Sequence, residues 1–220
     1  MSCVILHLET ATKVCSVALS VDGNLVAIKE SASDAYIHGE YLTLFIEEVL
    51  QVSNINIKQL SAVSISSGPG SYTGLRIGVS TAKGLCFGLQ IPLIEIETLD
   101  ALMQKGYKMN GTANLLAVLD ARRMEVYSLI QSSKGKILKP VSADILVENS
   151  YSEFEPLICF GDGTEKLKEL WKKRAITFMD DINCSACDQV ELAYSKFQKK
   201  DFQDLNNFTP KYLKEYQFGI

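Results

Sequence analysis

The sequence VILHLETATKVCSVALSVDGNLVAIK, residues 4–29, contains three short runs with the character of β-strands. Val4–Leu8 is apolar apart from one histidine, and Val14–Val21 alternates with the period of two that is typical of a strand. Asp22-Gly23-Asn24 is a hairpin turn signal between the second run and Leu25–Lys29. The chain is therefore predicted to open with three consecutive antiparallel strands.

Helices and strands alternate in the residues that follow. Apolar side chains in residues 38–51 recur at i, i+3, i+4, i+7 and i+8, as they do on one face of a helix. A strand at 62–66, a helix at 72–89, a strand at 92–96 and a helix at 98–108 come next. Hairpins followed by βαβ connections predict a mixed sheet and an α/β fold, because a Rossmann sheet would begin with βαβ directly.

The second half of the chain repeats this opening in a shorter form. After a boundary region at 106–111, Leu115–Leu119 and Glu125–Ile130 are predicted to form another hairpin, with a short third strand at 137–138. A strand at 158–160 and helices at 164–173 and 184–200 follow, before a tail at 208–216. We therefore predict two lobes, residues 1–105 and a smaller second lobe of residues 106–220.

The composition is that of a globular protein without a strong charge. The chain has 220 residues, of which 47% are hydrophobic and 22% are charged, and its formal net charge is −4. No apolar run approaches the length of a membrane helix, and the first residues lack the features of a signal peptide. Six scattered cysteines without a secretion signal suggest a reducing compartment, so we expect a cytoplasmic protein. The charge offers nucleic acid no strong field.

The loop Ser67-Gly68-Pro69-Gly70-Ser71 lies between a predicted strand and the helix at 72–89. Glycines permit close approach of a ligand, and a helix N-terminus attracts anions. The spacing of Gly68, Gly70 and Gly74 fits neither the P-loop nor the dinucleotide fingerprint. Two interpretations stay open: an anion-binding loop, and a tight turn that simply needs glycine.

The helix at 72–89 contains several glycines, each of which costs roughly 0.8–1 kcal/mol relative to alanine. Gly74, Gly78 and Gly88 share one side with Thr81, which predicts very close packing there against the sheet or a second helix. The other side mixes charged and apolar residues: Arg76, Val79, Lys83, Cys86 and Phe87. That side is either an interaction face or an ordinary packing face.

Three weaker candidates for a site remain. The turn Glu9–Thr12 could hold phosphates, although a plain turn is the simpler interpretation. Cys184 and Cys187 have the spacing of half a zinc site, but no second Cys/His pair lies near them, and His7 and His38 have no evident nucleophile partner. A basic run is more typical of a solvated helix face than of an RNA surface: Lys166, Lys168, Lys172, Lys173 and Arg174.

Seven short segments match one family pattern in order along the chain. They are ILHLETAT (5–12), GPGSYTGLRIG (68–78), AKGL (82–85), PLI (92–94), DARRMEVY (120–127), GDG (161–163) and PKYLK (210–214). Together they resemble the TsaB (YeaZ) family, bacterial partner proteins in the threonylcarbamoyladenosine modification of tRNA. The match is dense over 4–102 and sparser to 214, where Lys214 replaces the family's arginine.

This resemblance implies the actin/Hsp70-like ATPase (ribonuclease H-like) fold, with two lobes of which the second is reduced. It also implies descent from the same ancestor as TsaD, the catalytic paralogue, whose HxxxH pair binds the active-site metal. The two histidine positions fall on Thr98 and Leu102 here, and neither can replace imidazole as a ligand. The resemblance thus implies a chain with no catalytic residue and no metal site, which also argues against a metallopeptidase.

The family uses its first two helices to pair with itself or with TsaD. The resemblance therefore implies an interface made by these residues: His38, Tyr41, Leu42, Phe45, Tyr72, Leu75, Arg76, Val79 and Lys83. A small TsaE-type ATPase is expected to engage the pair, and tRNA is expected to contact this chain only indirectly through the complex. No cofactor is required, and ATP or ADP could bind only at a shared or vestigial site.

Two other functions stay open from the sequence. The chain could be a small ATP-binding ATPase or phosphotransferase. The phosphates would then lie between Glu9, Thr10 and Thr12 of the first lobe and Gly161 and Gly163 of the second. It could also be a homodimeric scaffold with unrelated clients, which would use the same helices but would have no effect on tRNA.

Overall fold

The computed structural model describes residues 2–32, 38–108 and 112–214. Contacts divide the chain into two compact units. The first contains residues 1–101 and 184–211, and the second contains residues 102–183 and 212–220. Within the described residues, no helix combines the length and the apolar character that crossing a membrane requires.

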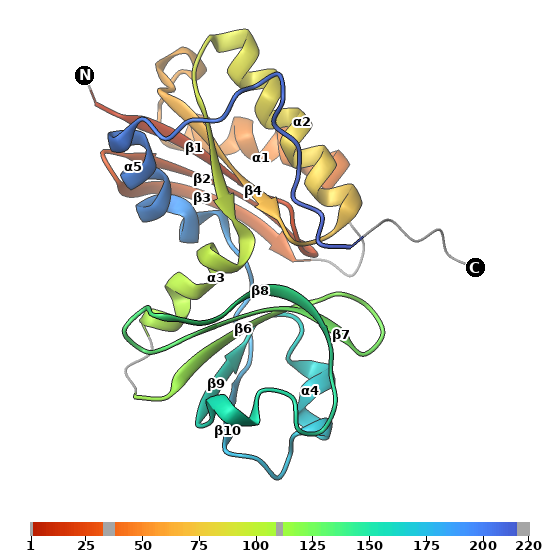
Figure 1. Ribbon diagram of the computed structural model, residues 1–220. Coiled ribbons are helices and arrows are strands. Elements are labelled where there is room, and N and C mark those ends of the chain that lie inside the picture. Colours follow the sequence, from red (N-terminus) through yellow and green to blue (C-terminus); the bar gives the residue numbers. More distant parts are fainter. Residues whose placement is uncertain (1, 33–37, 109–111, 215–220) are drawn as a thin grey trace. The chain divides into compact units, whose positions relative to one another are not determined.

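The first unit is built on a five-stranded sheet in the order β3-β2-β1-β4-β5 (Figure 1). Its strands are β1 (Val4–Glu9), β2 (Val14–Val21), β3 (Asn24–Ala32), β4 (Ala62–Gly68) and β5 (Leu93–Glu97). The first three pair antiparallel, and β4 and β5 then add in parallel. The predicted mixed sheet is therefore confirmed.

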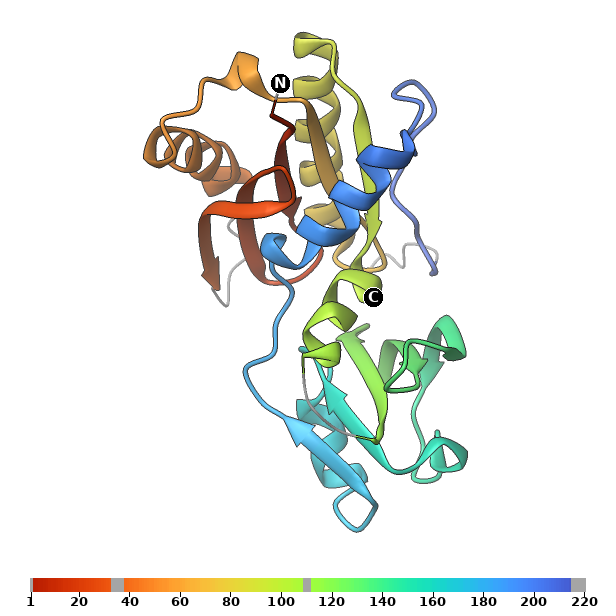
Figure 2. The same ribbon diagram turned by 90° about the vertical axis from the view of Figure 1, so that its left-hand side faces the viewer.

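Helices cover both faces of this sheet (Figure 2), and alternation along β1 sends its side chains to both layers. Leu6 and Leu8 belong to the core under α1 (His38–Val52) and α2 (Tyr72–Leu89). Ile5 faces the opposite layer, which contains α5 (Val190–Lys199). A short 3₁₀ helix, η3 (Ala186–Gln189), leads into α5. Another, η1 (Ile57–Gln59), precedes β4.

The second unit has its own five-stranded sheet, in the order β10-β9-β6-β7-β8. The strands are β6 (Asn114–Asp120), β7 (Glu125–Gln131), β8 (Ile137–Ile145), β9 (Leu157–Phe160) and β10 (Ile176–Met179). The helices are α3 (Thr98–Tyr107), which leads in from the first unit, and α4 (Glu165–Leu170), with the 3₁₀ turn η2 (Ser152–Phe154). A buried cluster around Trp171 and Leu167 fills the core. The hairpin is as predicted, β8 is longer, α4 is shorter, and β10 was not predicted.

The segment 184–211 lies in a different unit from the one we expected. We predicted that everything after residue 105 would form the second lobe, whereas 184–211 returns to the first unit. Ala193 of α5 packs with Ile5 and Ile96 and covers the face of the first sheet opposite α1 and α2. An apolar stripe on a helix shows that the helix packs, but not which sheet it packs on.

Candidate functional site

The turn after β1 is held by its own chain. The carboxylate of Glu9 is fully buried; its Oε1 accepts a hydrogen bond from the Ala11 amide over 2.7 Å, and its Oε2 accepts one from the Ser66 hydroxyl. Burial raises the pKa of Glu9 to about 7, against the opposing effect of these hydrogen bonds. A carboxylate that already has buried partners at both oxygens is poorly placed to hold a magnesium ion or a metal-bound water.

A buried polar chain extends from Glu9 across the sheet. Gln189 Nε2 donates to Ser66 Oγ over 2.9 Å, and Gln189 Oε1 accepts from Ser64 Oγ over 2.7 Å. The ring of His7 lies 2.7 Å from Ser64 Oγ on one side and 2.7 Å from Ser20 Oγ on the other. Burial lowers the pKa of His7 to about 3, so this histidine is neutral. Its role is to complete the hydrogen-bond chain.

The glycines at the start of α2 make room for that same turn. A Cβ on Gly70 would overlap the carbonyl oxygen of Ala11. A Cβ on Gly74 would overlap the carbonyl oxygen of Thr10, and a Cβ on Gly78 would overlap the hydroxyl oxygen of Thr10. The nearest neighbour that requires these glycines is therefore the β1–β2 turn. A Cβ would also crowd His38 of α1 at Gly74 and Ile65 of β4 at Gly78.

The 67–71 loop is likewise covered by the chain itself. Ser71 donates its amide to the Ala11 carbonyl over 2.6 Å and caps α2 by accepting from the Gly74 amide. Gly68 has φ of 118°, a region that favours glycine, and a Cβ there would overlap the carbonyl oxygen of Lys211. The amide of Lys211 in turn donates to the Ser67 carbonyl over 2.7 Å. Of our two interpretations, the geometry favours the tight turn.

Five of the nine side chains that we placed at an interface are buried inside the first unit. They are His38, Leu42, Phe45, Leu75 and Val79. On the side of α2 that the sequence leaves open as an interaction face or a packing face, Val79 and Cys86 face the core. Gly88, which we predict in close packing, faces open space. The β1–β2 turn is short and packs only against the first part of α2, at Gly74 and Gly78. The helical period alone therefore gave the wrong environment for Gly88.

The outer surface of the two helices is formed by other residues. We define the α1–α2 surface as Tyr41, Leu44 and Val52 of α1 with Tyr72, Arg76, Gly84, Phe87 and Gly88 of α2. Phe87 is 81% exposed, and a Cβ on Gly84 or Gly88 would meet no atom within 4 Å. The Arg76 guanidinium stacks 3.9 Å from the centre of the Tyr72 ring. Phe87 is on the side of α2 that the sequence leaves open as an interaction face, but it is not among the nine predicted interface residues.

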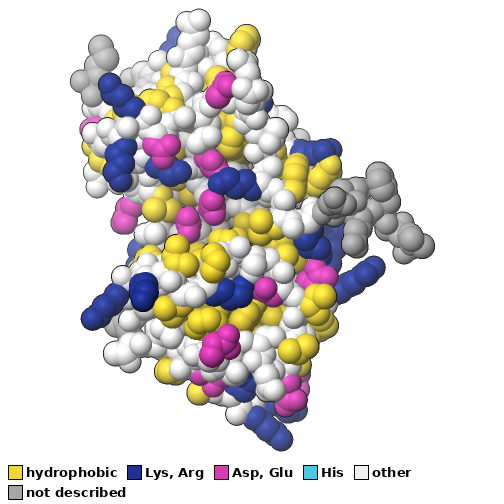
Figure 3. Space-filling model, in the orientation of Figure 1, with side chains coloured by type: hydrophobic (Ala, Val, Ile, Leu, Met, Phe, Trp, Pro, Cys, Tyr) yellow, Lys and Arg dark blue, Asp and Glu magenta, His cyan; other side chains and the backbone are white. Residues whose placement is uncertain are grey.

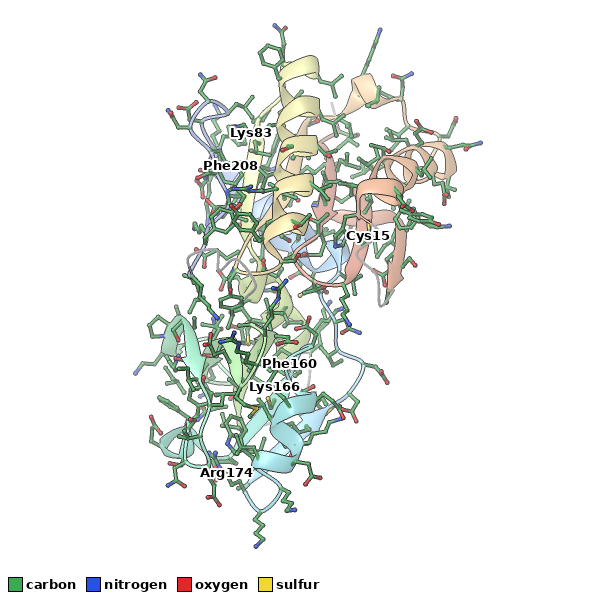
Figure 4. All side chains as sticks on the ribbon, turned by 90° about the vertical axis from the view of Figure 1, so that its right-hand side faces the viewer. Cys15, Lys83, Phe160, Lys166, Arg174 and Phe208 are labelled. Carbon is green, nitrogen blue, oxygen red and sulfur yellow. The ribbon has the colours of Figure 1, made fainter. Side chains whose placement is uncertain are left out.

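Lys83 supports the C-terminal segment (Figure 4). Its ammonium donates to the carbonyl oxygen of Phe208 over 3.0 Å, and the Phe208 ring is buried in the core under α2. The segment continues to Lys211, which forms ion pairs of 2.6 Å with Glu95 and with Glu97. Lys83 is thus part of the structure of the first unit and is only half-exposed at its surface.

In the second unit the glycine turn is packed against β6. A Cβ on Gly161 would overlap the Val118 carbonyl oxygen, and Gly163 lies against the backbone of Leu119. An open pocket of about 490 Å³ lies beside this turn. Its lining includes four carboxylates, from Asp162, Glu165, Asp180 and Asp181. Its one lysine, Lys168, already pairs with Glu165 and Asp180. Such a lining repels the phosphates of a nucleotide.

The remaining sequence candidates lie apart from any common site. In the basic run, four charges are paired with carboxylates. Lys166 pairs with Asp120, Lys168 with Glu165 and Asp180, Lys172 with Glu169, and Arg174 with Glu155. Cys184 is buried, and Cys187 lies 3.2 Å from the hydroxyl of Ser185, which caps η3. Over residues 2–32, 38–108 and 112–214, no three His, Cys, Asp or Glu side chains are grouped as a metal site would require.

Thr98 and Leu102, the residues that we expect at the paralogue's two histidine positions, are both buried on α3. Leu102 packs against the glycine turn, since a Cβ on Gly161 would touch its Cδ2.

Comparison with known proteins agrees with this architecture. The family model "TsaD: tRNA N6-adenosine threonylcarbamoyltransferase" matches residues 30–219. The TsaB protein of Escherichia coli K12, named for tRNA threonylcarbamoyladenosine biosynthesis, is 29% identical over 96% of this chain and 94% of its own length. The TsaB protein of Haemophilus influenzae is 38% identical over 56% of this chain and 51% of its own length.

Among solved structures, YeaZ from Pseudomonas aeruginosa superposes with a TM-score of 0.81 at 24% identity, over 96% of this chain and 100% of that chain. This likeness shows the fold, which is that of the actin-like ATPases. The family model covers most of the sequence. The chain therefore belongs to the TsaD family, within which it is a TsaB (YeaZ) protein.

Proposed function

We propose that this chain is a non-catalytic partner subunit of a TsaD-type transferase. In this role it supports the transfer of a threonylcarbamoyl group from its adenylate to an adenosine beside the tRNA anticodon, in the cytoplasm. The relatives' names refer to the biosynthesis of this modified nucleoside. The chain requires no cofactor of its own, and tRNA reaches it through the complex.

The observation that carries this proposal is the exposed aromatic group on α2. Phe87 is 81% exposed, and Leu44 and Tyr41 on α1 are 49% and 40% exposed. Large exposed apolar side chains on adjoining helices are typical of a protein interface, whose core is enriched in aromatic residues and arginine. Arg76, stacked on Tyr72, adds a pre-ordered cation to the same surface.

Two glycines of α2 support the same surface. Gly84 and Gly88 are one helical turn apart, and nothing in the described chain approaches the place of their missing Cβ atoms. Internal glycines that no neighbour requires weaken a helix by roughly 0.8–1 kcal/mol each. A second helix that packs closely beside Phe87 would explain why α2 keeps them, and a TsaD-type protein is the partner that we propose.

The homodimer is expected to use the same surface. Pairing with a second copy and pairing with the TsaD-type protein would then exclude each other, so the heterodimer would form at the expense of the homodimer. A TsaE-type ATPase would engage the assembled pair, and any ATP or ADP would bind to the complex and not to the turn at Glu9–Thr12.

The ATP-binding enzyme remains the alternative, but the geometry does not favour it. In the first unit, the turn at Glu9–Thr12 is filled by its own contacts with α2 and Ser66. In the second, the pocket beside Gly161 is lined by acidic residues. Titration with ATP and magnesium separates the two functions, because tight binding with turnover would favour the enzyme.

The test is a reconstituted modification reaction with the TsaD-type and TsaE-type proteins of the same host. We expect formation of the modified nucleoside to depend on this chain and to fall when Phe87→Asp is used. The matched control is Ile145→Asp, which changes a side chain on β8 that is 72% exposed. The proposal fails if tRNA is modified equally well without this chain.

A further inference from the structure

The tip of the β6–β7 hairpin carries two adjacent residues in the left-handed backbone region. Arg122 has φ of 66° and Arg123 has φ of 50°. This region is unfavourable for any residue with a Cβ, and hairpin tips normally meet the requirement with glycine or asparagine. Both arginines are exposed, so packing of their side chains does not explain the conformation.

Contacts to the backbone hold the tip in this conformation. The Arg122 amide donates to Asp120 Oδ1 over 2.7 Å, and the Leu146 amide donates to the Met124 carbonyl over 2.9 Å. The Lys166 ammonium donates to the carbonyl oxygens of Arg123 and Glu125 over 2.8 Å each. Figure 4 shows Lys166 on α4 in the second unit. The surrounding structure therefore fixes the shape of the tip in advance.

Two of the acidic groups around the tip are paired with lysines, and a third, Asp162, accepts a hydrogen bond from the Asp120 amide. Asp120 pairs with Lys166, and Glu125 pairs with Lys214. Within the described residues, neither the Arg122 nor the Arg123 guanidinium forms a hydrogen bond or an ion pair. The charge of Arg122 opposes the rise that burial causes in the pKa of Tyr127. The tip thus presents two unpaired positive charges next to Met124, whose side chain is 43% exposed.

We propose that the tip formed by Arg122, Arg123 and Met124 is a docking site for an acidic segment of a protein partner. Two carboxylates would bind the guanidinium groups, which are suited to bidentate pairing, and an apolar side chain between them would cover Met124. Backbone strain that a structure maintains at exposed polar residues is characteristic of recognition sites. The site lies in the second unit and goes beyond the pairing role of the α1–α2 surface.

A protein partner fits this charge pattern better than RNA does. Binding along a phosphate backbone uses a broad field of lysine and arginine, whereas four cations in the nearby run are paired with carboxylates. On the face in Figure 3, cationic and acidic side chains are intermixed. The whole chain carries a net charge of −4. Arginine and methionine are also the residues that protein interfaces favour over lysine.

The test follows the amide signals of the full-length ¹⁵N-labelled chain by NMR. The probe is a blocked pentapeptide of alternating glutamate and leucine, and its lysine–leucine counterpart is the control peptide. We expect saturable shifts confined to residues 121–126 with the acidic probe only. Arg122→Glu combined with Arg123→Glu should weaken binding by at least about fivefold. The matched control, Lys172→Glu with Lys173→Glu, reverses the same number of charges elsewhere in the unit and should leave the affinity unchanged.

A second variant separates binding from folding. Arg122→Gly with Arg123→Gly removes both charges but suits the left-handed backbone, so we expect an unchanged or higher melting temperature together with lost binding. The proposal is overturned if the probe shifts no tip signals, or if both charge-reversal variants bind it equally. It is also overturned if bulk tRNA shifts the same signals at lower concentration than the peptide does. None of these outcomes depends on a TsaD-type protein, so the proposed function is tested separately.

Discussion

The side-chain amide of Gln189 donates a hydrogen bond to the main-chain carbonyl of Leu8 over 2.8 Å and joins residues 181 positions apart. Through the same side chain, η3 is bonded to Ser64 and Ser66 on β4. This residue therefore fixes the returning segment 184–211 to the middle of the first sheet. The buried hydrogen-bond chain that ends at Glu9 depends on it.

Replacing Gln189 with alanine should destabilise the protein strongly. The change removes three buried hydrogen bonds, to the Leu8 carbonyl and to the Ser64 and Ser66 hydroxyls, which keep only His7 and Glu9 as partners. Each such bond contributes roughly 0.5–1.5 kcal/mol. We expect the free energy of unfolding in urea to fall by about 3 kcal/mol. Gln198→Ala, on the exposed side of α5, is the control and should change it by less than about 0.5 kcal/mol. Equal effects would show that the network contributes little.

Glu9 and His7 should oppose each other in the pH dependence of stability. Burial raises the pKa of Glu9 from 4.5 to about 7, so its contribution to stability is lost as pH rises from about 4.5 to 7. Burial lowers the pKa of His7 from 6.5 to about 3, so its contribution is lost as pH falls from about 6.5 to 3. Between about pH 4.5 and 6.5 the two slopes have opposite signs and nearly cancel.

The variant Glu9→Gln should remove the slope of Glu9 and leave that of the buried histidines, to which His7 contributes. Relative to the unmodified chain, its free energy of unfolding should rise by about 1.4 kcal/mol per pH unit between about pH 4.5 and 6.5. Urea denaturation at several pH values measures this difference. Parallel curves for the two proteins would mean that Glu9 does not titrate as its buried position implies.

Alanine substitutions at two glycines of α2 should have opposite effects. Gly74→Ala would force a Cβ into the Thr10 carbonyl oxygen, and overpacking of this kind typically costs about 1–3 kcal/mol. Gly84→Ala meets no atom and should stabilise the isolated chain by up to about 1 kcal/mol. Thermal unfolding of both variants checks the signs. If Gly84 contributes to a helix–helix interface, the stabilised variant should also pair less tightly with its partner.

The attachment of the C-terminal segment should depend on Lys83. Lys83→Met keeps the length of the side chain but removes the hydrogen bond to the Phe208 carbonyl. Hydrogen exchange should become faster at the Lys211 amide, which donates to Ser67, while the amides of β1 should be unaffected. Lys58→Met, on η1, is the control, because its ammonium forms no bond within the described residues. Unchanged exchange at Lys211 would show that Lys83 does not hold the segment.

Local patterns predicted the fold where one strand or helix contains its own signal. The alternation of Val14–Val21 and the turn at Asp22–Asn24 predicted two antiparallel pairings that the structure confirms. The mixed sheet followed from the order of these elements. The glycine block at 68–78 and the other motifs predicted the TsaB (YeaZ) family, which the TsaB relatives and the TsaD family model together confirm.

The rest depended on contacts between residues far apart in the sequence. Nothing near Gln189 indicates that it bonds to Leu8, and a helical stripe in α5 does not specify which sheet it covers. The helical period identified glycines that need space at 74 and 78, but not that the packing turn ends before Gly88. Five predicted interface residues are buried within the first unit, four of them apolar, because an apolar stripe wide enough for an interface also covers a sheet.

The most direct test of the partner role is the mass of the chain in solution, measured by light scattering alone and with the TsaD-type protein of its own host. We expect a homodimer that converts to a one-to-one heterodimer. Phe87→Asp should block both forms, and Ile145→Asp should block neither. A mixture that shows only the two separate proteins, with or without nucleotide and the TsaE-type ATPase, would contradict the proposed function.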